Sequence, residues 1–283
     1  MKLYEITAKA SLNPTVSRIA VYAPRIAVKA QAGQFVILRV DADGERIPLT
    51  VADFDRRAGT VTVIYQIVGA TTLKLDGLRV GECLHDLVGP LGRPTELEGL
   101  RSVAVVGGGV GCAIALPTAK KLHELGATVH SVIGFRNKDL VILKDEFQAV
   151  SDEFVLVTDD GSAGRKGLVT DALKALIDSG NKYDEVIAIG PLAMMKFVCR
   201  LTETYGIKTV VSMNPIMIDG TGMCGGCRIT VGGEMKFACV DGPDFDGHKV
   251  DFDEAIERGR MYADFERRAY EKECNLLKGA HGE

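Results

Sequence analysis

Residues 102 to 212 alternate short apolar runs with segments of helical spacing, and this alternation restricts the possible folds more than any other feature. The apolar runs are, in chain order, SVAVVGGG, TVHSVIGFR, FVLVTDDG, EVIAIGP and KTVVSM. Helical segments lie between them, and Gly126 follows the first as a typical C′ cap. Strands that alternate with helices form parallel sheets with helical crossovers. We therefore predict an α/β domain over residues 99–213.

The first 98 residues show a different pattern, in which short apolar or alternating runs are separated by turns. RIAVYAP, QFVILRV, PLTVAD and GTVTVIYQIVG read as strands, and AQAGQ, DADGER and DFDRRAG read as turns. We find no convincing helical pattern in this part. The sequence predicts an antiparallel barrel or sandwich over residues 1–98, with the boundary shortly after VGPLGRP at residues 88–94.

The chain after Met213 changes pattern twice. Residues 214–250 are rich in glycine, cysteine and aspartate, which suits a small module held by a metal. Residues 251–283 read as a helix that Asp251 or Asp253 caps. Apolar side chains fall near one stripe of this helix, namely Phe252, Ile256, Tyr262, Phe265 and Ala269. The stripe either packs on its own domain or contacts a partner.

Charge and composition exclude several classes of protein. The 283-residue chain has a net charge of −4, which argues against a nucleic-acid-binding protein. No apolar run reaches the ~18 residues of a membrane span, and the first residues lack the pattern of a secretory signal. Seven cysteines, four of them scattered singly, fit a reducing compartment better than a disulfide framework. We therefore expect a cytoplasmic protein that binds neither nucleic acid nor membrane.

Three cysteines cluster in the Gly-rich segment DGTGMCGGC and shortly after it. A plant-type [2Fe–2S] site has the spacing C-x₄-C-x₂-C…C. Here the spacing is D-x₄-C-x₂-C-x₁₁-C, with a carboxylate where the first thiolate would stand. The surrounding glycines allow the backbone to approach the cluster sulfides closely. The candidate ligands are Asp219, Cys224, Cys227 and Cys239.

Two other interpretations of this segment remain open at the level of sequence. Zinc accepts sulfur and oxygen donors, so a structural zinc site with three cysteines and one aspartate has the same ligands. Alternatively, the fourth ligand of a cluster comes from elsewhere, and Cys199 or Cys274 is then the candidate.

A glycine-rich turn follows the first strand of the α/β domain. Glycines between a buried strand and a helix let backbone N–H groups and the helix N-terminus approach a phosphate. The glycines are Gly107, Gly108, Gly109 and Gly111, and Arg136 follows the next strand, where it can meet a ribose or phosphate. Because the loops after parallel strands meet at one edge of the sheet, we expect a nucleotide site there. A tight turn without a ligand is the alternative.

The whole order of motifs resembles the ferredoxin–NADP reductase superfamily. VVGGGVG, TDDGSAGRKGLVTD, IGPLAMMK and the cluster loop match, in order, the branch that contains the electron-transfer subunit of dihydroorotate dehydrogenase. Within it, the chain is similar over nearly its whole length to the small (alpha) subunit of NADH-dependent reduced ferredoxin:NADP⁺ oxidoreductase. That subfamily carries aspartate at the first cluster position, where the dihydroorotate dehydrogenase subunit carries cysteine. The resemblance therefore implies that Asp219 is the fourth ligand.

The resemblance also assigns roles in a β-barrel flavin domain. RIPLT matches the flavin motif, and Thr50 is implied to place its hydroxyl near the reactive nitrogen N5, which makes it the catalytic candidate. The usual arginine of this motif is replaced by Ile47, and Arg46, one position earlier, is the candidate partner of the flavin phosphate. The other residues implied along the FAD are Pro48, Leu49, Tyr65, Gln66, Ile67, Thr71 and Thr72. The residues implied to frame the nucleotide, besides the glycine turn, are Asp160, Gly190 and Pro191.

The function implied by the resemblance is electron transfer. Hydride passes between NAD(H) and FAD, and single electrons pass to the [2Fe–2S] cluster. The implied partner is a larger subunit with its own FAD, [4Fe–4S] clusters and an NADP(H) site, so that the complex couples NADH and reduced ferredoxin to NADP⁺ reduction, or bifurcates electrons in reverse. The alternatives are an electron-transfer subunit of another dehydrogenase, such as dihydroorotate dehydrogenase or a bifurcating hydrogenase, and a zinc-stapled nucleotide-binding protein without redox activity.

Overall fold

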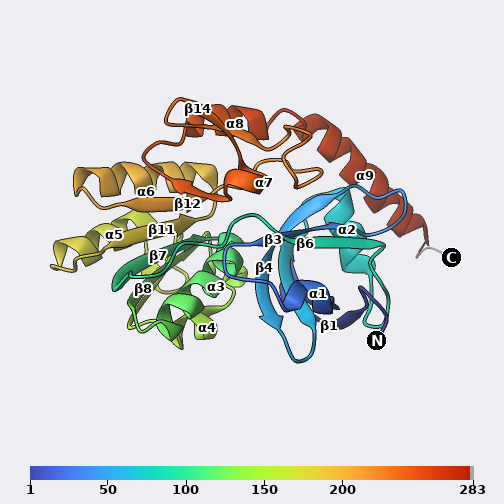
Figure 1. Cartoon of the computed structure of the whole chain (residues 1–283), viewed down its shortest axis with the longest axis horizontal. Coiled ribbons are helices and arrows are strands. Elements are labelled where there is room, and N and C mark those ends of the chain that lie inside the picture. Colours follow the sequence, from blue (N-terminus) through green and yellow to red (C-terminus); the bar gives the residue numbers. More distant parts are fainter. Residues whose placement is uncertain (281–283) are drawn as a thin grey trace.

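A computed structural model describes residues 1–280, and its N-terminal part is a six-stranded antiparallel sheet (Figure 1). The strand order is β1-β2-β5-β4-β3-β6. Inward-facing aliphatic side chains such as Ile19, Val21 and Val63 surround one buried core, as the alternating pattern predicts. The strands are β1 Ile6–Asn13, β2 Val16–Tyr22, β3 Phe35–Arg39, β4 Ile47–Asp55, β5 Thr60–Gln66 and β6 Asp86–Leu91. Helix α1 covers Pro24–Ala27 and α2 covers Ala70–Gly77.

We expected no helix among residues 1–98, and that expectation is wrong, because α1 and α2 lie there. Helix α2 is fixed by side-chain contacts rather than by an amphipathic pattern. The hydroxyl of Thr72 accepts hydrogen bonds from the backbone N–H groups of Val68 and Gly69, both at 3.0 Å, and so satisfies donors at the helix start. Leu75, which is fully buried, anchors the helix on the barrel.

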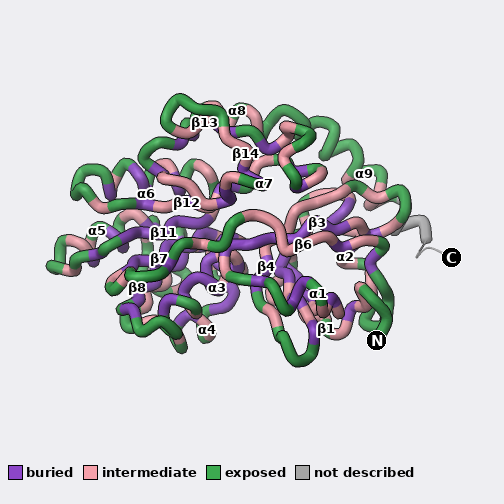
Figure 2. Tube along the Cα trace, in the orientation of Figure 1, coloured by how far each residue is buried: buried purple, intermediate pink, exposed green. Residues whose placement is uncertain are grey.

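The middle of the chain forms the predicted α/β domain around a seven-stranded sheet of order β10-β9-β8-β7-β11-β12-β15. Successive residues of β7 face opposite sides, so that Val103 and Val105 pack with α3 and Ala104 and Val106 pack with α5 and α6. The central strands are buried on both faces (Figure 2). The strands are β7 Ser102–Gly108, β8 Thr128–Phe135, β9 Glu153–Thr158, β10 Arg165–Lys166, β11 Glu185–Ile189 and β12 Thr209–Ser212. The helices are α3 Gly111–Glu124, the 3₁₀ turn Lys138–Leu140, α4 Lys144–Gln148, α5 Val169–Asp178 and α6 Leu192–Thr204.

This sheet is not entirely parallel. Strand β15, Asp244–Asp246, comes from the Cys-rich segment and pairs antiparallel with β12 at the sheet edge. The same segment contains a hairpin of β13 Arg228–Val231 and β14 Glu234–Phe237, followed by α7 Ala238–Asp241. The segment predicted as a separate module is therefore joined to the α/β domain by a strand.

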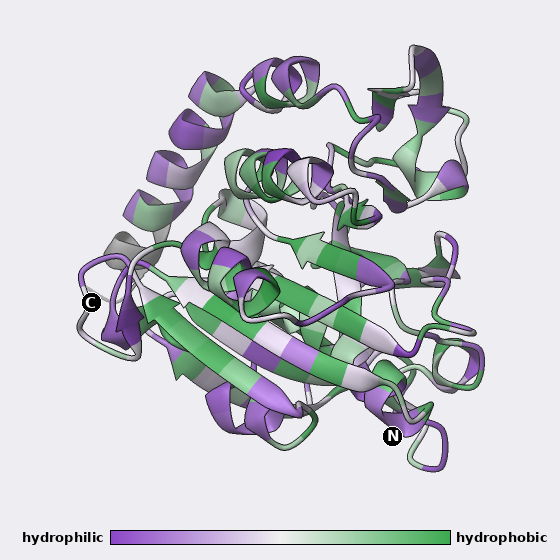
Figure 3. Ribbon diagram, turned by 90° about the vertical axis from the view of Figure 1, so that its left-hand side faces the viewer, coloured by the Kyte–Doolittle hydropathy of each residue, from purple (hydrophilic) through white to green (hydrophobic). Residues whose placement is uncertain are grey.

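The C-terminal segment forms two helices instead of the single predicted one. Helix α8 covers Phe252–Gly259 and α9 covers Ala263–Ala280. Asp251 caps α8, because its Oδ1 accepts a hydrogen bond of 3.0 Å from the N–H of Glu254. Helix α9 is largely hydrophilic and runs back to lie against α2 of the barrel (Figure 3).

The predicted apolar stripe divides at the break between these helices. Phe252 is buried, whereas Tyr262 and Phe265 are 48% and 67% exposed. The stripe therefore packs on its own domain only in its first part. Among residues 1–280, no helix combines the length and the apolar character that crossing a lipid bilayer requires.

Candidate functional site

A cleft of about 1230 Å³ lies between the barrel and the carboxyl edge of the parallel strands. Both groups of sequence motifs contribute to its wall, as expected for loops that gather at one edge of a parallel sheet. The predicted residues that line it are Pro48, Leu49, Thr50, Tyr65, Gln66, Thr72, Gly108, Gly109, Gly111, Arg136, Gly190 and Pro191.

Five predicted cofactor-binding residues lie outside the lining of this cleft. Thr71 donates to the Glu45 carboxylate at 3.2 Å, and Ile67 packs on the barrel core. Gly107 faces Cys112, and Asp160 accepts hydrogen bonds from the backbone and hydroxyl of Ser162, while its neighbour Asp159 lines the cleft. Arg46 is directed to the cluster loop, where its Nε donates to the carbonyl of Ile218 at 2.9 Å.

The glycine turn has the geometry that a phosphate site requires. Gly109 has φ +56°, a conformation that glycine adopts without strain. A Cβ on Gly111 would lie 2.5 Å from the carbonyl oxygen of Ile189 and 2.6 Å from Cα of Gly190, so only glycine fits. Helix α3 begins at Gly111, which lines the cleft, so the positive end of the helix dipole lies at the cleft wall.

The barrel side of the cleft is held rigid by a buried polar contact. The Tyr65 hydroxyl donates to Oδ1 of Asp76 at 3.3 Å, and Ser17 donates to the same oxygen at 2.6 Å. Burial raises the pKa of Tyr65, and the Asp76 charge adds to the effect, so the phenol stays protonated. Thr50, which pairs with Phe35 across β3 and β4, also lines the cleft.

The four candidate metal ligands lie in two pairs. Cys227 and Cys239 are buried, and their sulfurs are 3.2 Å apart. Burial, followed by the contact with Cys227, raises the pKa of the Cys239 thiol to about 12. Two thiols this close can serve as ligands of one metal ion, because a bound metal deprotonates them and accepts their charge.

Asp219 and Cys224 form the second pair, at the more exposed end of the loop. One Asp219 oxygen accepts from Thr221, by its N–H and by its hydroxyl at 2.9 Å, and the other accepts from the N–H of Cys224 at 2.8 Å. These backbone hydrogen bonds lower the pKa of Asp219 to about 2. The Asp219 side chain is therefore an ionised carboxylate beside Cys224, and its oxygens are candidate metal ligands.

The four candidate ligands form two pairs rather than one group. Within residues 1–280, no group of three or more Asp, Glu, Cys or His side chains converges closely enough to hold one metal ion. A [2Fe–2S] cluster needs only two protein ligands on each iron. The pairs Cys227–Cys239 and Asp219–Cys224 match that requirement.

The two remaining cysteine candidates lie elsewhere in the fold. Cys199 is part of the α/β core on α6, where its sulfur faces Gly247. Cys274 lies on α9 beside Tyr270. Neither packs with the cysteine pair, so the structure gives no support to a fourth ligand from outside the loop.

The cluster loop is seated directly on the barrel. Gly220, next to Asp219, has φ +78°, and a Cβ there would lie 2.7 Å from the methyl carbons of Ile37 and Leu91. A larger residue would be strained by this φ and would push the Ile37 and Leu91 side chains of β3 and β6 aside. The cysteine pair packs in one apolar cluster with Phe35, Ile37, Met217 and Ala238.

Phe35 and Met217 lie between the cleft and the cysteine pair, and neither of them was identified from the sequence. Both line the cleft, and both belong to the apolar cluster of Cys227 and Cys239. One layer of side chains thus separates the cleft from the cysteine pair. The apolar pattern around Phe35 predicts only burial, and no sequence signal distinguishes a residue that has the cleft on one side and the cluster on the other.

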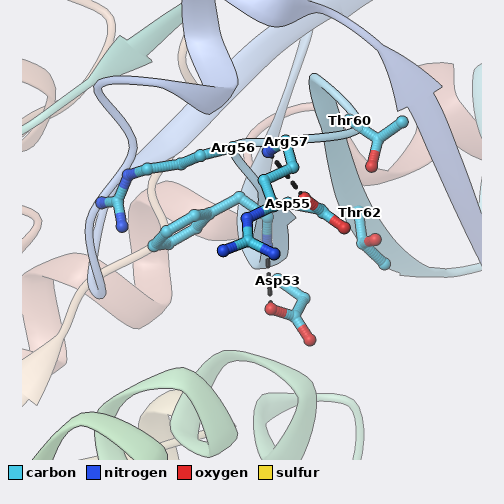
Figure 4. A pocket seen from close by; sticks show the side chains of 7 residues that line it. Asp53, Asp55, Arg56, Arg57, Thr60 and Thr62 are labelled. Carbon is cyan, nitrogen blue, oxygen red and sulfur yellow. Dashed lines mark hydrogen bonds between the residues drawn. The ribbon is translucent and has the colours of Figure 1, made fainter.

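A second hollow, of about 470 Å³, lies at the turn between β4 and β5 (Figure 4). Its polar groups are engaged locally. Asp55 accepts hydrogen bonds from the backbone of Arg57 and Ala58, at 2.8 and 2.9 Å, and Asp53 pairs with Lys120 at 2.9 Å. None of the predicted site residues lines it, and we assign it no function.

Comparison with known proteins agrees with this geometry. Residues 214–251 match the family model described as the iron–sulfur cluster binding domain of dihydroorotate dehydrogenase B. An electron-transfer subunit homolog of dihydroorotate dehydrogenase B (NAD⁺) from Thermotoga maritima is 47% identical and covers 95% of each chain. The corresponding subunit from Streptococcus pneumoniae is 33% identical over 87% of this chain and 96% of its own.

A solved structure of an NADH-dependent reduced ferredoxin–NADP oxidoreductase, described for flavin-based electron bifurcation, is also similar. It aligns with a TM-score of 0.91 at 45% identity, and the alignment covers 96% of this chain and 98% of the other. The similarity therefore extends through the barrel, the α/β domain and the cluster loop.

Proposed function

The chain belongs to the family of the electron-transfer subunit of dihydroorotate dehydrogenase B and its homologues, and we propose that it exchanges hydride between NAD(H) and FAD and passes single electrons to a [2Fe–2S] cluster. It is an oxidoreductase subunit of the flavin and iron–sulfur class. The observation that carries the proposal is the layer of Phe35 and Met217, which is shared by the cleft and the cysteine pair.

The residues that hold each group follow from the cleft wall. Pro48, Leu49 and Thr50 would hold the flavin ring, and Tyr65, Gln66 and Thr72 would follow its chain. Gly108 to Gly111, with Gly190 and Pro191, would hold the dinucleotide at the N-terminus of α3. Asp219, Cys224, Cys227 and Cys239 would hold the cluster. A bound flavin links the two-electron chemistry of a nicotinamide to one-electron acceptors.

The chain's own contribution is positioning and electrostatics. Thr50 is the hydroxyl-bearing residue of the flavin motif in the lining and would place its hydroxyl near the flavin, and the positive end of α3 would stabilise the charge of the nucleotide phosphates. The apolar layer of Phe35 and Met217 keeps water out between the cleft and the cysteine pair. The reaction requires neither a side-chain nucleophile nor a side-chain general acid.

We further propose that the partner is a larger subunit with its own FAD, [4Fe–4S] clusters and NADP(H) site, in a complex that couples NADH and reduced ferredoxin to NADP⁺ reduction. Support comes from the 45% identity to the NADH-dependent reduced ferredoxin–NADP oxidoreductase structure, and from Asp219 at the first cluster position. The relatives named above are electron-transfer subunits, which supports a multi-subunit assembly.

The decisive experiment is native purification with identification of the partner, together with iron, sulfide, zinc and flavin analysis. We expect iron and sulfide in the ratio of a [2Fe–2S] cluster, FAD, and faster bleaching of the flavin by NADH than by NADPH. A colourless protein that contains zinc and no flavin would contradict the proposal. A partner that oxidises dihydroorotate would instead show that this chain is the electron-transfer subunit of a dihydroorotate dehydrogenase.

The catalytic position is tested at Thr50. Thr50→Val removes the hydroxyl at nearly constant volume, and we expect flavin reduction by NADH to slow by roughly 10²-fold, as for other preorganised hydrogen-bond donors. Thr50→Ser keeps the hydroxyl and should retain most of the rate. Stopped-flow absorbance of the holoprotein measures both, and a Val variant as fast as the wild type would remove Thr50 from the mechanism.

A further inference from the structure

Arginine side chains surround the cluster loop, and each donates to a backbone carbonyl rather than to a ligand. From the barrel, Arg46 Nε donates to the carbonyl of Ile218 at 2.9 Å. Arg93 Nε, also from the barrel, donates to the carbonyl of Val240 at 3.0 Å. Ile218 immediately precedes the candidate ligand Asp219.

The second contact is placed in the same way. Val240 immediately follows Cys239. The two barrel arginines therefore hydrogen-bond to the residue just before the first ligand and to the residue just after the last ligand. The backbone of Arg93 adds a hydrogen bond of 2.7 Å from its N–H to the carbonyl of Gly242. The loop is thus attached to the barrel at both of its ends.

Two more arginines approach the C-x₂-C turn from the loop and from the C-terminal segment. Arg228 Nη1 lies 3.4 Å from the carbonyl oxygen of Gly225, and Arg258 Nη2, on α8, lies 3.4 Å from that of Gly226. These contacts are longer and weaker, but they place two further positive charges beside the same short turn.

From these contacts we propose that Arg46, with Arg93 in a lesser role, is a positioning residue that holds the cluster loop on the barrel and raises the reduction potential of the cluster. The inference rests on the proposed function. Three thiolates and a carboxylate give a [2Fe–2S] centre a net negative charge, which increases by one on reduction. A nearby fixed positive charge therefore stabilises the reduced form more than the oxidised form.

The structure also indicates which arginine matters more. The Arg46 side chain is 31% exposed and that of Arg93 is 70% exposed, so solvent screens Arg93 more strongly. Each is partly balanced by an acid, Asp86 at 3.6 Å from Arg46 and Asp241 at 4.0 Å from Arg93. Removal of either arginine leaves that acid unpaired, which shifts the potential in the same direction.

The test uses full-length holoprotein and the variants Arg46→Met, Arg46→Lys and Arg93→Met. Iron content and EPR-monitored redox titration are the readouts, and neither depends on turnover. At a fixed solution potential, we expect Arg46→Met to lower the ratio of reduced to oxidised cluster about tenfold, or ~59 mV for one electron. Arg93→Met should shift it less, and Arg46→Lys should restore most of the wild-type value because it keeps the charge.

Arg56→Met is the matched control. Arg56 also lies in the barrel and donates to two carbonyls, those of Val28 at 3.4 Å and Ala30 at 3.1 Å, both of which belong to the barrel rather than to the cluster loop. It should leave the potential and the iron content unchanged. Loss of iron in Arg46→Met, with flavin retained and iron retained in the control, also supports the positioning role.

Two results would overturn the inference. One is an Arg46→Met protein with the potential, EPR signal and iron content of the wild type, and the other is an equal shift in Arg56→Met. The proposed function fails in a different way, namely if the wild-type protein itself contains no iron–sulfur cluster.

Discussion

Gly111 shows how a single missing side chain decides the shape of the nucleotide turn. A Cβ at this position would lie 2.5 Å from the Ile189 carbonyl oxygen and 2.6 Å from Cα of Gly190, and neither backbone atom can move without shifting β11. The glycine therefore allows α3 and the end of β11 to meet at the cleft.

We expect Gly111→Ala to lower the free energy of unfolding by about 1–3 kcal/mol, since it overpacks a site enclosed by backbone. Urea denaturation measures the change. Gly77→Ala is the control, because nothing lies within 4 Å of a Cβ at this position in α2, and it should raise the free energy of unfolding by about 0.4–1 kcal/mol. Equal stabilities for the Gly111 variant and the wild type would show that the turn opens without cost.

At the residue scale, most of the cofactor-binding residues predicted from the sequence lie in the cleft wall, but some predicted side chains point elsewhere. The motif around Thr50 and the glycine turn could be read because spacing and residue type are both informative there. The contact of Arg46 with Ile218 joins residues 172 positions apart, so no local pattern predicts it. The same holds for Asp160, whose side chain closes its own turn on Ser162 while Asp159 faces the cleft.

At the scale of elements, Asp244 on β15 connects all three parts of the chain. The Thr95 hydroxyl donates to its Oδ2 at 2.6 Å from the barrel side, and β15 itself pairs with β12. Its Oδ1 is inaccessible to solvent and has no hydrogen-bond partner among residues 1–280. Burial raises the pKa of Asp244 to about 6, against the hydrogen bonds from Thr95 and Ser212, which lower it.

This pKa gives a stability profile with a defined sign. Because the folded state binds the Asp244 proton more tightly than the unfolded state, the stability from this group is complete below about pH 4 and is lost as the pH rises through about 6. Asp244→Asn stays neutral, so its melting temperature relative to the wild type should rise from pH 5 to pH 7.5. Asp246→Asn removes a carboxylate that pairs with Lys249 at 3.0 Å, and it is the matched control for the loss of one negative charge from the same strand. A constant difference for Asp244→Asn would contradict the raised pKa.

The two C-terminal helices offer a second comparison between elements. Phe252 at the start of α8 is 6% exposed, and Phe265 in α9 is 67% exposed. We expect Phe252→Ala to cost about 3–5 kcal/mol of unfolding free energy and Phe265→Ala less than about 0.5 kcal/mol. Chemical denaturation of the isolated subunit checks both, and a large loss for Phe265→Ala would mean that α9 packs more tightly than its exposure indicates.

The elements themselves were predictable where their periodicity is strong. The β–α alternation from residue 102 to 212 fixes most strands and helices of that sheet. Helix α2 could not be predicted because it is defined by the Thr72 hydrogen bonds and by the burial of Leu75 rather than by an amphipathic pattern. Strand β15 could not be predicted because three residues are too few to show an alternating pattern. The residues between α8 and α9 are compatible with a helix in sequence but do not form one. The chain changes direction there, because α8 packs on the α/β domain through Phe252 and α9 packs against α2.

At the scale of the whole molecule, the cysteine-rich segment is held by contacts of three kinds. Strand β15 ties it to the sheet, Gly220 seats it on β3 and β6, and the cysteine pair packs with Phe35 and Met217. Its own apolar core is small, and most of its length is turn and loop. A segment of this kind depends on its metal, because metal binding supplies folding free energy that such a core lacks.

Removal of the metal should therefore unfold this segment selectively. After iron is stripped by a chelator under reducing conditions, we expect hydrogen exchange to increase in residues 214–240, whereas β7 and β11, buried on both faces, keep their protection. FAD should remain bound, since the flavin wall of the cleft comes from β4 and β5 of the barrel. Asp219→Ala should produce a milder form of the same change, because three thiolates remain. Uniform loss of protection in both sheets would show instead that the metal holds the whole chain together, and unchanged exchange in the loop would show that its contacts with the barrel suffice.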